Sequence, residues 1–201
     1  ALVRIDANAV DPWRLEAVAP TLEYLGQHAR KVIVMAHKGR PAPGKTKRAF
    51  SLKETAQQIA NLVHPDVWFI PETTMTEVKR ELKKIPDGSI VILQNIRSFR
   101  GETTSSPQLA KSLASLGDYY VSDAFPVLHH GGSTVTELPK LLPSYAGFHL
   151  EEEMQQLNKL QRVKHPYVVV IGGAKAKDKL GVIKQCINKA DYILVGGASA
   201  N

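Results

Sequence analysis

Short runs of β-branched and aliphatic residues alternate along the chain with longer segments in which apolar residues recur every three to four positions. The short runs are typical of strands buried on both faces, and the spacing of three to four is typical of helices with one buried face. The predicted strands are Leu2–Ile5, Val32–Met35, Val67–Ile70, Ile90–Leu93, Tyr119–Val121, Val168–Ile171 and Tyr192–Val195. The predicted helices of the first 149 residues are 21–30, 51–63, 76–84 and 107–116. Because strands and helices alternate strictly, the pattern predicts an α/β fold, in which a parallel sheet is flanked by helices in a Rossmann-like arrangement of three layers.

Two further expectations follow from this pattern. Ser51 followed by Glu54 is a capping box, which places the start of the second helix at residue 52. Open α/β sheets bind their ligands beyond the carboxyl ends of the strands. The residues that follow each predicted strand are therefore the first candidates for a functional site.

A second, smaller α/β lobe is predicted towards the end of the chain. The segment LEEEMQQLNKLQRV predicts a connecting helix, and a β-α-β unit with a helix near 177–189 follows it. The predicted domains are residues 1–149, an α/β domain; residues 150–166, an interdomain helix and hinge; and residues 167–201, the first and incomplete β-α-β unit of a second domain.

The helix near 177–189 carries an apolar face that so small a unit cannot bury, because the unit excludes too little surface from water. This face consists of Val182, Ile183, Cys186 and Ile187. We therefore expect residues 1–201 to be part of a longer polypeptide, or a second segment to complete the lobe.

Composition narrows the class of protein. The 201 residues are 43% hydrophobic and 22% charged, as in ordinary globular proteins. The sequence has no apolar run long enough to span a membrane and no signal peptide. Its single cysteine, Cys186, excludes an intramolecular disulfide and favours a reducing cytoplasm, and its place in a periodic run predicts a core residue.

The net charge of +7 favours an anionic partner. The basic residues are not interleaved with aromatic ones, and no nucleic-acid-binding motif is present, so a small polyanionic substrate explains the charge as well as nucleic acid does. We expect no nucleic-acid partner, no membrane, a cytoplasmic location and a monomer.

One stretch matches the phosphate-loop pattern G-x-x-x-x-G-K-[ST] letter for letter, from Gly39 to Thr46. A working phosphate loop needs consecutive backbone N–H groups and a helix that opens at its Lys-Ser/Thr pair. Pro41 and Pro43 remove two of those N–H groups, and the next predicted helix starts only after Ser51. The pattern is therefore interpreted as a coincidence, with a phosphate-loop NTPase built on Lys45 kept as a rival.

Seven motifs in register carry a resemblance to a known family. They are RIDAN (4–8), AHKGRP (36–41), ILQNIRSFRGE (92–102), SDAFPVLHHGGST (122–134), AGFHLEEEMQQL (146–157), VIGGAKAKDKL (170–180) and GGASAN (196–201). In order, they resemble the R-V-D-F-N, S-H-L-G-R-P, L-E-N-V-R-F with G-E, N-D-A-F-G-T-A-H-R-A-H-S-S, interdomain-helix, L-G-G-A-K-V-x-D-K-I and G-G-G-M-A-N segments of phosphoglycerate kinases. The resemblance covers nearly the whole chain.

The resemblance implies a substrate site on the first domain. The residues that would bind phosphoglycerate are Asp6, Asn8, His37, Arg40 and Arg97, with Arg4 close by and His130 in the place of a substrate-site arginine. Arg14 would stabilise the phosphoryl group during transfer. A cluster of arginines suits such a ligand, because guanidinium groups bind phosphate and carboxylate oxygens in a bidentate fork.

The resemblance also implies a nucleotide site on the second domain. Gly172 and Gly173 would let backbone N–H groups approach the nucleotide, and Lys175 and Lys179 align with lysines that contact the nucleotide and the transferred phosphate. On spacing alone, this Gly-Gly-x-Lys turn is as readily a plain tight turn. Mg²⁺ would accompany ATP or ADP. His129 and His130 are adjacent, which is not metal-ligand spacing, so we assign no metal site to residues of the protein.

Several positions depart from the family pattern. The stretch between Asn8 and Arg14 is short, Ala7 replaces a phenylalanine, and Gln94 replaces a glutamate. His130 replaces the arginine of A-H-R-A-H, and Gly132 replaces its second histidine. We therefore expect a weaker affinity for 3-phosphoglycerate than is usual in the family.

By the resemblance, the chain is expected to act in reversible phosphoryl transfer between 1,3-bisphosphoglycerate and ADP, giving 3-phosphoglycerate and ATP, as in glycolysis. The family's magnesium-binding aspartate and glycine-rich turn lie beyond Asn201, so the 201 residues alone are expected not to turn over. A non-catalytic relative that binds a phosphorylated ligand or a partner is the main alternative.

Overall fold

The computed structural model describes residues 1–8, 13–43, 48–160, 163–173 and 180–197 of the chain. It divides into two compact units, Ala1–Glu153 and Met154–Asn201.

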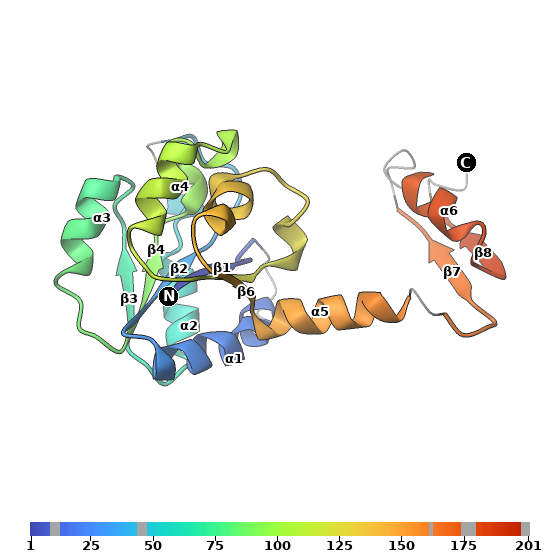
Figure 1. Cartoon of the computed structure of the whole chain (residues 1–201), viewed down its shortest axis with the longest axis horizontal. Helices are drawn as coiled ribbons and strands as arrows, with labels where there is room; N and C mark the ends of the chain where they lie inside the picture. The colour runs from blue at the N-terminus through green and yellow to red at the C-terminus, as the bar shows by residue number, and fades with distance from the viewer. Residues whose placement is uncertain (9–12, 44–47, 161–162, 174–179, 198–201) are drawn as a thin grey trace. The chain divides into compact units, whose positions relative to one another are not determined.

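The first unit is built on one six-stranded parallel sheet (Figure 1). Its strands are β1 (Leu2–Ile5), β2 (Lys31–Met35), β3 (Val67–Ile70), β4 (Ser89–Leu93), β5 (Tyr120–Asp123) and β6 (Ser144–Ala146). The spatial order is β3-β4-β2-β1-β5-β6, and every neighbouring pair is parallel. All six carboxyl ends therefore meet at one edge of the sheet, and β1 lies between β2 and β5.

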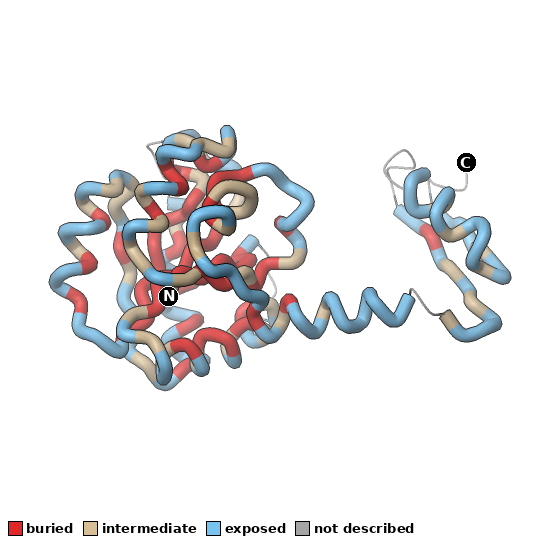
Figure 2. The backbone as a smooth tube through the Cα atoms, in the orientation of Figure 1, coloured by how far each residue is buried: buried red, intermediate tan, exposed pale blue. Residues whose placement is uncertain are grey.

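Helices cover both faces of this sheet, so the predicted three-layer α/β fold is confirmed. They are α1 (Trp13–His28), α2 (Lys53–Ala60), α3 (Met75–Leu82) and α4 (Pro107–Ala114). Successive strand residues point to opposite faces: Val3 packs in the cluster that includes α1 and α2, and Leu2 packs in the cluster that includes α3 and α4. Figure 2 shows the buried residues concentrated in this unit.

Three local predictions need correction. Strand β6 was not predicted, because its three residues are all exposed at the sheet edge and lack an apolar run. Helix α1 begins at Trp13 and not near residue 21; Pro20 lies inside it, and a proline normally marks a helix boundary. The capping box is found only in part: α2 begins at Lys53 with Leu52 as its N-cap residue, and the Ser51 hydroxyl accepts from the Lys53 amide at 3.3 Å. The Ser51 amide, however, donates to the Arg48 carbonyl oxygen and not to Glu54.

Short turns follow the carboxyl ends of β2, β4 and β5. They are the 3₁₀ turns Arg48–Phe50, Ile96–Ser98, Glu102–Thr104, Phe125–Val127 and Leu138–Lys140, and the π turn Ser133–Glu137. Among the described residues after β2, the turn Arg48–Phe50 comes first and helix α2 begins at Lys53. Lys45 itself lies outside the described residues.

The helix α5 (Phe148–Lys159) spans the boundary between the two units. In the second unit, β7 (Val168–Ile171) and β8 (Tyr192–Val195) form a parallel pair, and α6 (Leu180–Cys186) lies between them in sequence. The apolar residues of this second unit are largely exposed to solvent, as expected for so small a unit; Val170 is 75% exposed and Ile187 is 62% exposed. Cys186 is only half-buried, so its predicted core position is not found in this unit.

None of the described helices is both long and apolar enough to cross a membrane.

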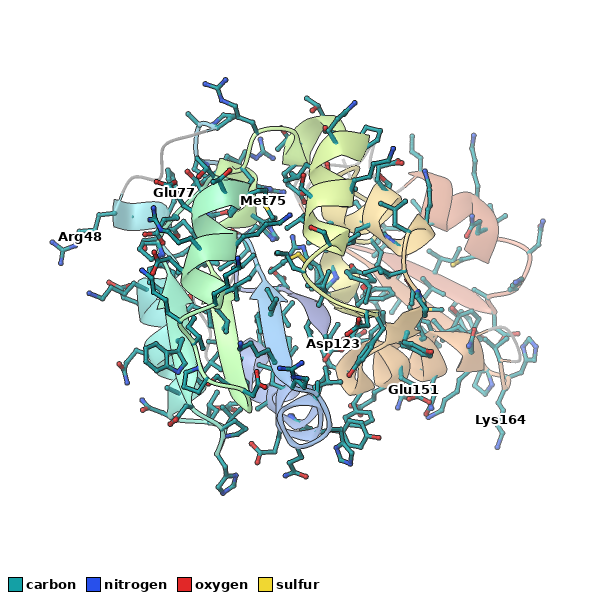
Figure 3. All side chains as sticks on the ribbon, turned by 60° about the vertical axis from the view of Figure 1, so that its left-hand side comes forward. Arg48, Met75, Glu77, Asp123, Glu151 and Lys164 are labelled. Carbon is teal, nitrogen blue, oxygen red and sulfur yellow. The ribbon has the colours of Figure 1, made fainter. Side chains whose placement is uncertain are left out.

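The first turn of α5 is tied to the sheet by Asp123, the last residue of β5. Its carboxylate accepts a hydrogen bond from the Leu150 amide at 2.8 Å, and the Phe148 amide donates to the Thr21 hydroxyl at 2.9 Å. Burial raises the pKa of Asp123, and the hydrogen bonds from Thr21 and Leu150 oppose this shift. Figure 3 labels Asp123 at this position. Gly147 allows the approach, because a Cβ there would lie 2.3 Å from the Asp123 Cγ.

We predict that Gly147→Ala destabilises the protein by about 2 to 3 kcal/mol, since the added methyl group must displace the buried carboxylate. Urea unfolding monitored by circular dichroism measures the change. Gly131→Ala is the matched control, because the nearest atom to its Cβ is the Ser105 Oγ at 3.5 Å. Equal unfolding free energies for the two variants would contradict this account of the contact.

Candidate functional site

The carboxyl edge of the sheet gathers polar side chains from three neighbouring strands. Arg4 belongs to β1, and Asp6 and Asn8 follow it. His37 follows β2, and Arg97 lies in the turn after β4. Because β1, β2 and β4 are adjacent and parallel, these positions meet at one edge, as the sequence predicted.

Arg4 is the buried centre of this cluster, with only 3% of its surface exposed. Its Nη1 donates to the carbonyl oxygens of Ile5 and, at 3.4 Å, of Met35. Its Nη2 contacts Nδ1 of His37 at 3.0 Å. Burial lowers the pKa of Arg4, and the negative charge of Glu102 is the largest opposing influence. A guanidinium remains protonated after such a shift, so the edge of the sheet holds a fixed positive charge.

His37 is buried beside this charge and is neutral. Burial, together with the positive charges of Arg4 and Arg97, lowers its pKa to about 3. Its Nδ1 also lies 3.9 Å from a carboxylate oxygen of Asp6. His37 therefore acts as a hydrogen-bonding group, not as a cation, at neutral pH.

Asp6 organises the loop after β1. One of its carboxylate oxygens accepts a hydrogen bond from the Asn8 amide at 2.9 Å, and the other forms an ion pair with Nη1 of Arg14. Arg14 thus reaches the cluster from the first turn of α1. Its Nε is buried and has no hydrogen-bond partner among the described residues. The Asn8 side chain accepts a hydrogen bond from the Gly39 amide at 2.6 Å, which joins the loops after β1 and β2.

Arg97 and Arg40 add positive potential at the same edge, and His130 lies near both. Nη1 of Arg97 donates to the Gly39 carbonyl oxygen at 2.9 Å. Desolvation is the largest cause that lowers the pKa of Arg97, and the nearby positive charge of Arg40 is the second largest. The pKa of His130 is lowered by desolvation, by His129 and by both arginines. His130 is therefore neutral at pH 7, which weakens it as a substitute for an arginine.

Sequence reasoning missed the residues that shape the loops under these side chains. Asn95 is fully buried: its Oδ1 accepts from the Arg97 amide, and its Nδ2 donates to the carbonyl oxygens of Lys38 and Phe50. Gln94 accepts hydrogen bonds from the amides of Leu52 and Asn95. The sequence did indicate this role, because two amide side chains directly after a buried strand can form hydrogen bonds with the backbone N–H and C=O groups of the following turn.

The predicted nucleotide-side residues are described in part. Gly172 and Gly173 follow β7, and Gly173 has φ of 119°, a conformation that favours glycine. Lys175 and Lys179 lie outside the described residues. In the described part of the chain, no group of three histidine, cysteine, aspartate or glutamate residues could hold a metal ion.

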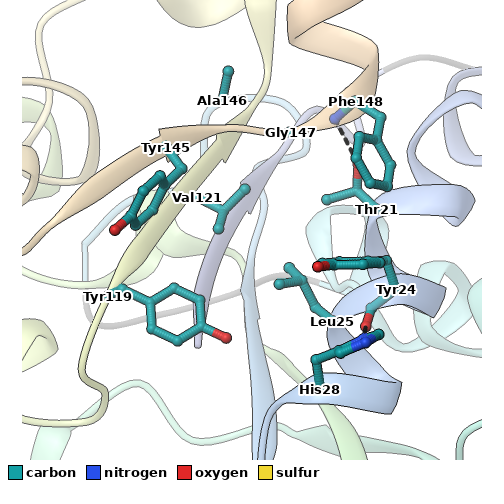
Figure 4. Close-up of a pocket in the computed structure, with 10 residues that line it drawn as sticks. All are labelled: Thr21, Tyr24, Leu25, His28, Tyr119, Val121, Tyr145, Ala146, Gly147 and Phe148. Carbon is teal, nitrogen blue, oxygen red and sulfur yellow. Dashed lines mark hydrogen bonds between the residues drawn. The ribbon is translucent and has the colours of Figure 1, made fainter.

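A separate cavity of about 410 Å³ lies between α1 and the strands β5 and β6 (Figure 4). Its walls are aromatic, with Tyr24 and Phe148 on one side and Tyr119 and Tyr145 on the other. None of the site residues predicted from the sequence lines it. The predicted residues instead converge on the carboxyl edge of the sheet.

The arrangement at that edge is suited to a small anion with several oxygen atoms. Arg4, Arg40 and Arg97 bring three guanidinium charges close enough to influence one another or their neighbours, and only part of that charge is balanced by Asp6 and Glu102. A bound carboxylate or phosphate would relieve this repulsion. The fold and the site thus define an α/β protein whose sheet edge carries an excess of positive charge.

Comparison with known proteins gives the family. The family model described as "Phosphoglycerate kinase" matches residues 2–201. The chain is 38% identical over 194 residues to the phosphoglycerate kinase of Coprothermobacter proteolyticus and 40% identical over 194 residues to that of Pseudothermotoga lettingae. Each alignment covers 96% of this chain and 49% of the relative. The chain belongs to the phosphoglycerate kinase family.

Solved structures agree. The phosphoglycerate kinase of Pyrococcus horikoshii superposes with a TM-score of 0.85 at 26% identity. The alignment covers 100% of this chain and 53% of that protein. The enzyme of Coxiella burnetii gives a TM-score of 0.82 at 26% identity, over 98% of this chain and 51% of the other. The chain thus spans about half the length of the curated relatives it matches.

The neutral state of His37 makes stability depend on pH. In the unfolded chain the histidine has a pKa near its ordinary value of about 6.5. Between that pH and the lower pKa of the folded state, the unfolded chain therefore binds a proton that the folded protein does not bind. The contribution of this group is therefore fully present above pH 6.5 and is lost as the pH falls towards 3. From pH 7 to pH 5 we predict a loss of about 2 kcal/mol from His37.

Urea unfolding at the two pH values measures this loss. His37→Gln, which cannot titrate, should show a smaller decrease between pH 7 and pH 5 than the wild type, whatever its stability at pH 7. His28→Gln, at an exposed histidine, is the control. A His37→Gln variant with the same pH dependence as the wild type would show that His37 is not held neutral.

Proposed function

We propose that the chain supplies the phosphoglycerate-binding part of a phosphoglycerate kinase. The enzyme would transfer a phosphoryl group from 1,3-bisphosphoglycerate to MgADP, giving 3-phosphoglycerate and MgATP, and the reverse. The observation that supports this proposal most directly is the gathering of Arg4, His37 and Arg97 at one sheet edge, in a chain that belongs to this family.

The roles of the side chains follow from their chemistry. Arg40 and Arg97 would bind phosphate or carboxylate oxygens of the phosphoglycerate, because their charges face one another and lack a full counter-charge. Asp6 and Asn8 would accept hydrogen bonds from the substrate or from the side chains that hold it. His37 would donate a hydrogen bond as a neutral group.

Arg14 would stabilise the phosphoryl group during transfer. Its Nη1 is occupied by Asp6, but its Nε–H has no hydrogen-bond partner among the described residues and would donate to an oxygen atom of the phosphoryl group. Phosphoryl transfer requires little covalent chemistry from the protein, so positioning and neutralisation of charge supply most of the catalysis.

The nucleotide would bind at the second unit. Gly172 and Gly173 would let the backbone approach the nucleotide phosphates, and Lys175 and Lys179 would contact the nucleotide and the transferred group. Mg²⁺ would arrive as part of the nucleotide substrate. In domain terms, residues 1–149 would bind phosphoglycerate, residues 150–166 would form the hinge, and residues 167–201 would begin the nucleotide domain. We further propose a monomeric protein of the cytoplasm.

Isothermal titration of 3-phosphoglycerate into the 201-residue chain tests this function. Arg97→Ala should weaken binding by about 10- to 100-fold, because a charged hydrogen bond contributes about 1.5 to 3 kcal/mol. Arg97→Lys should fall between, since lysine keeps the charge but loses the fork. Arg80→Ala, on α3 and paired with Glu81, is the matched control and should bind like the wild type.

A reciprocal variant sharpens this experiment. His130→Arg restores a permanent charge near Arg40 and Arg97, and should strengthen binding if this edge is the anion site. The proposal would be abandoned if the wild-type chain did not bind 3-phosphoglycerate, or if Arg97→Ala and Arg80→Ala had the same affinity.

A further inference from the structure

A buried chain of hydrogen bonds runs from an acidic residue outside the cluster to His37. Glu102, in the turn Glu102–Thr104, is 4% exposed. Its carboxylate accepts from the Thr134 hydroxyl at 2.5 Å and from the Thr134 amide at 3.1 Å. The Thr134 hydroxyl accepts from Nε of Arg4 at 3.2 Å, and Nη2 of Arg4 contacts Nδ1 of His37 at 3.0 Å.

With Glu102 ionised, the protons along this chain have one arrangement. Arginine only donates, so Nδ1 of His37 must accept, and the single proton of the neutral imidazole must lie on Nε2. For the same reason the Thr134 oxygen accepts from Arg4, and its own proton points to Glu102. Burial raises the pKa of Glu102, and the two hydrogen bonds from Thr134 and the charge of Arg4 oppose this rise and favour the ionised acid.

The surrounding turn is built to keep Glu102 in place. A Cβ at residue 132 would lie 3.1 Å from Oε1 of Glu102, so Gly132 leaves the carboxylate its room. The Ser133 hydroxyl lies 2.9 Å from the Gly101 carbonyl oxygen and 3.0 Å from that of Ser106, and its single proton can be donated to either, which holds the two turns together. Glu102 also supplies the largest negative influence on Arg4 and so balances a cation that would otherwise be costly to bury.

We propose that Glu102 and Thr134 are positioning residues that orient Arg4 and thereby hold His37 as its Nε2–H tautomer. In the part of the chain that the structure describes, no hydrogen bond to Nε2 of His37 is present, so this N–H can donate to an oxygen of an anion bound at the sheet edge. A neutral donor suits a ligand that the neighbouring arginines already neutralise, because it adds direction without adding charge. Only the identity of that anion as phosphoglycerate rests on the proposed function.

The tautomer can be observed directly by ¹⁵N nuclear magnetic resonance of His37 in the 201-residue chain at pH 7. The wild type should show an unprotonated Nδ1 and a protonated Nε2. Thr134→Val removes the oxygen that accepts from Arg4, and should give a mixture of tautomers or shift the Nδ1 resonance. Thr134→Ser keeps the hydroxyl and should restore the wild-type spectrum. Thr136→Val, in the same turn but outside the chain of hydrogen bonds, is the matched control.

Binding supplies the second readout. Thr134→Val should weaken 3-phosphoglycerate binding by about tenfold, the size of one lost hydrogen bond, and Thr134→Ser should not. A wild-type His37 with its proton on Nδ1 would overturn the inference even if the Thr134→Val variant did not fold. So would a folded Thr134→Val protein whose tautomer is unchanged. If the tautomers behave as predicted but the wild-type chain does not bind 3-phosphoglycerate, the proposed function fails and the positioning of His37 stands.

Discussion

The guanidinium of Arg4 lies buried at the carboxyl edge of the sheet, and the site is arranged around that one charge. A buried cation needs hydrogen bonds and a counter-charge, because removal from water is otherwise too costly. Main-chain carbonyl oxygens and the Thr134 hydroxyl accept hydrogen bonds from Arg4, and Glu102 supplies the counter-charge. Nδ1 of His37 accepts the hydrogen bond from Nη2 of Arg4. The pKa of His37 falls to about 3 as a consequence, since the imidazole is buried beside a permanent positive charge.

The parallel sheet makes this arrangement possible. Because β1 lies between β2 and β5, with β4 beyond β2, loops far apart in sequence open at the same edge. Asn8, Gly39 and Arg97 then join three of these loops through two hydrogen bonds. The arginines at the rim keep an excess of positive potential, which is a cost to the folded protein and an advantage for binding an anion.

The fold was predictable because its signals are local. Strands such as Leu2–Ile5 and Val67–Ile70 are continuous apolar runs, and their bounds were predicted without error. The exposed strand β6 and the start of α1 were not, since neither shows the usual pattern and Pro20 suggests a boundary. At the site, the residues implied by motif resemblance, such as His37 and Arg97, do converge. The role of Asn95 could have been inferred from its place directly after a buried strand. The contacts of Glu102 and Thr134 depend on side chains that meet only in three dimensions, so no spacing along the chain reveals them.

The central claim is that the carboxyl edge of the six-stranded sheet is the anion-binding surface of this protein. Chemical-shift mapping of the 201-residue chain with 3-phosphoglycerate tests it most directly, because the response is resolved residue by residue. The account predicts that the largest changes fall on His37, Arg40, Arg97 and His130, and that the aromatic cavity around Tyr24 and Tyr145 does not respond. Changes centred on that cavity, or no changes at saturating ligand, would contradict it.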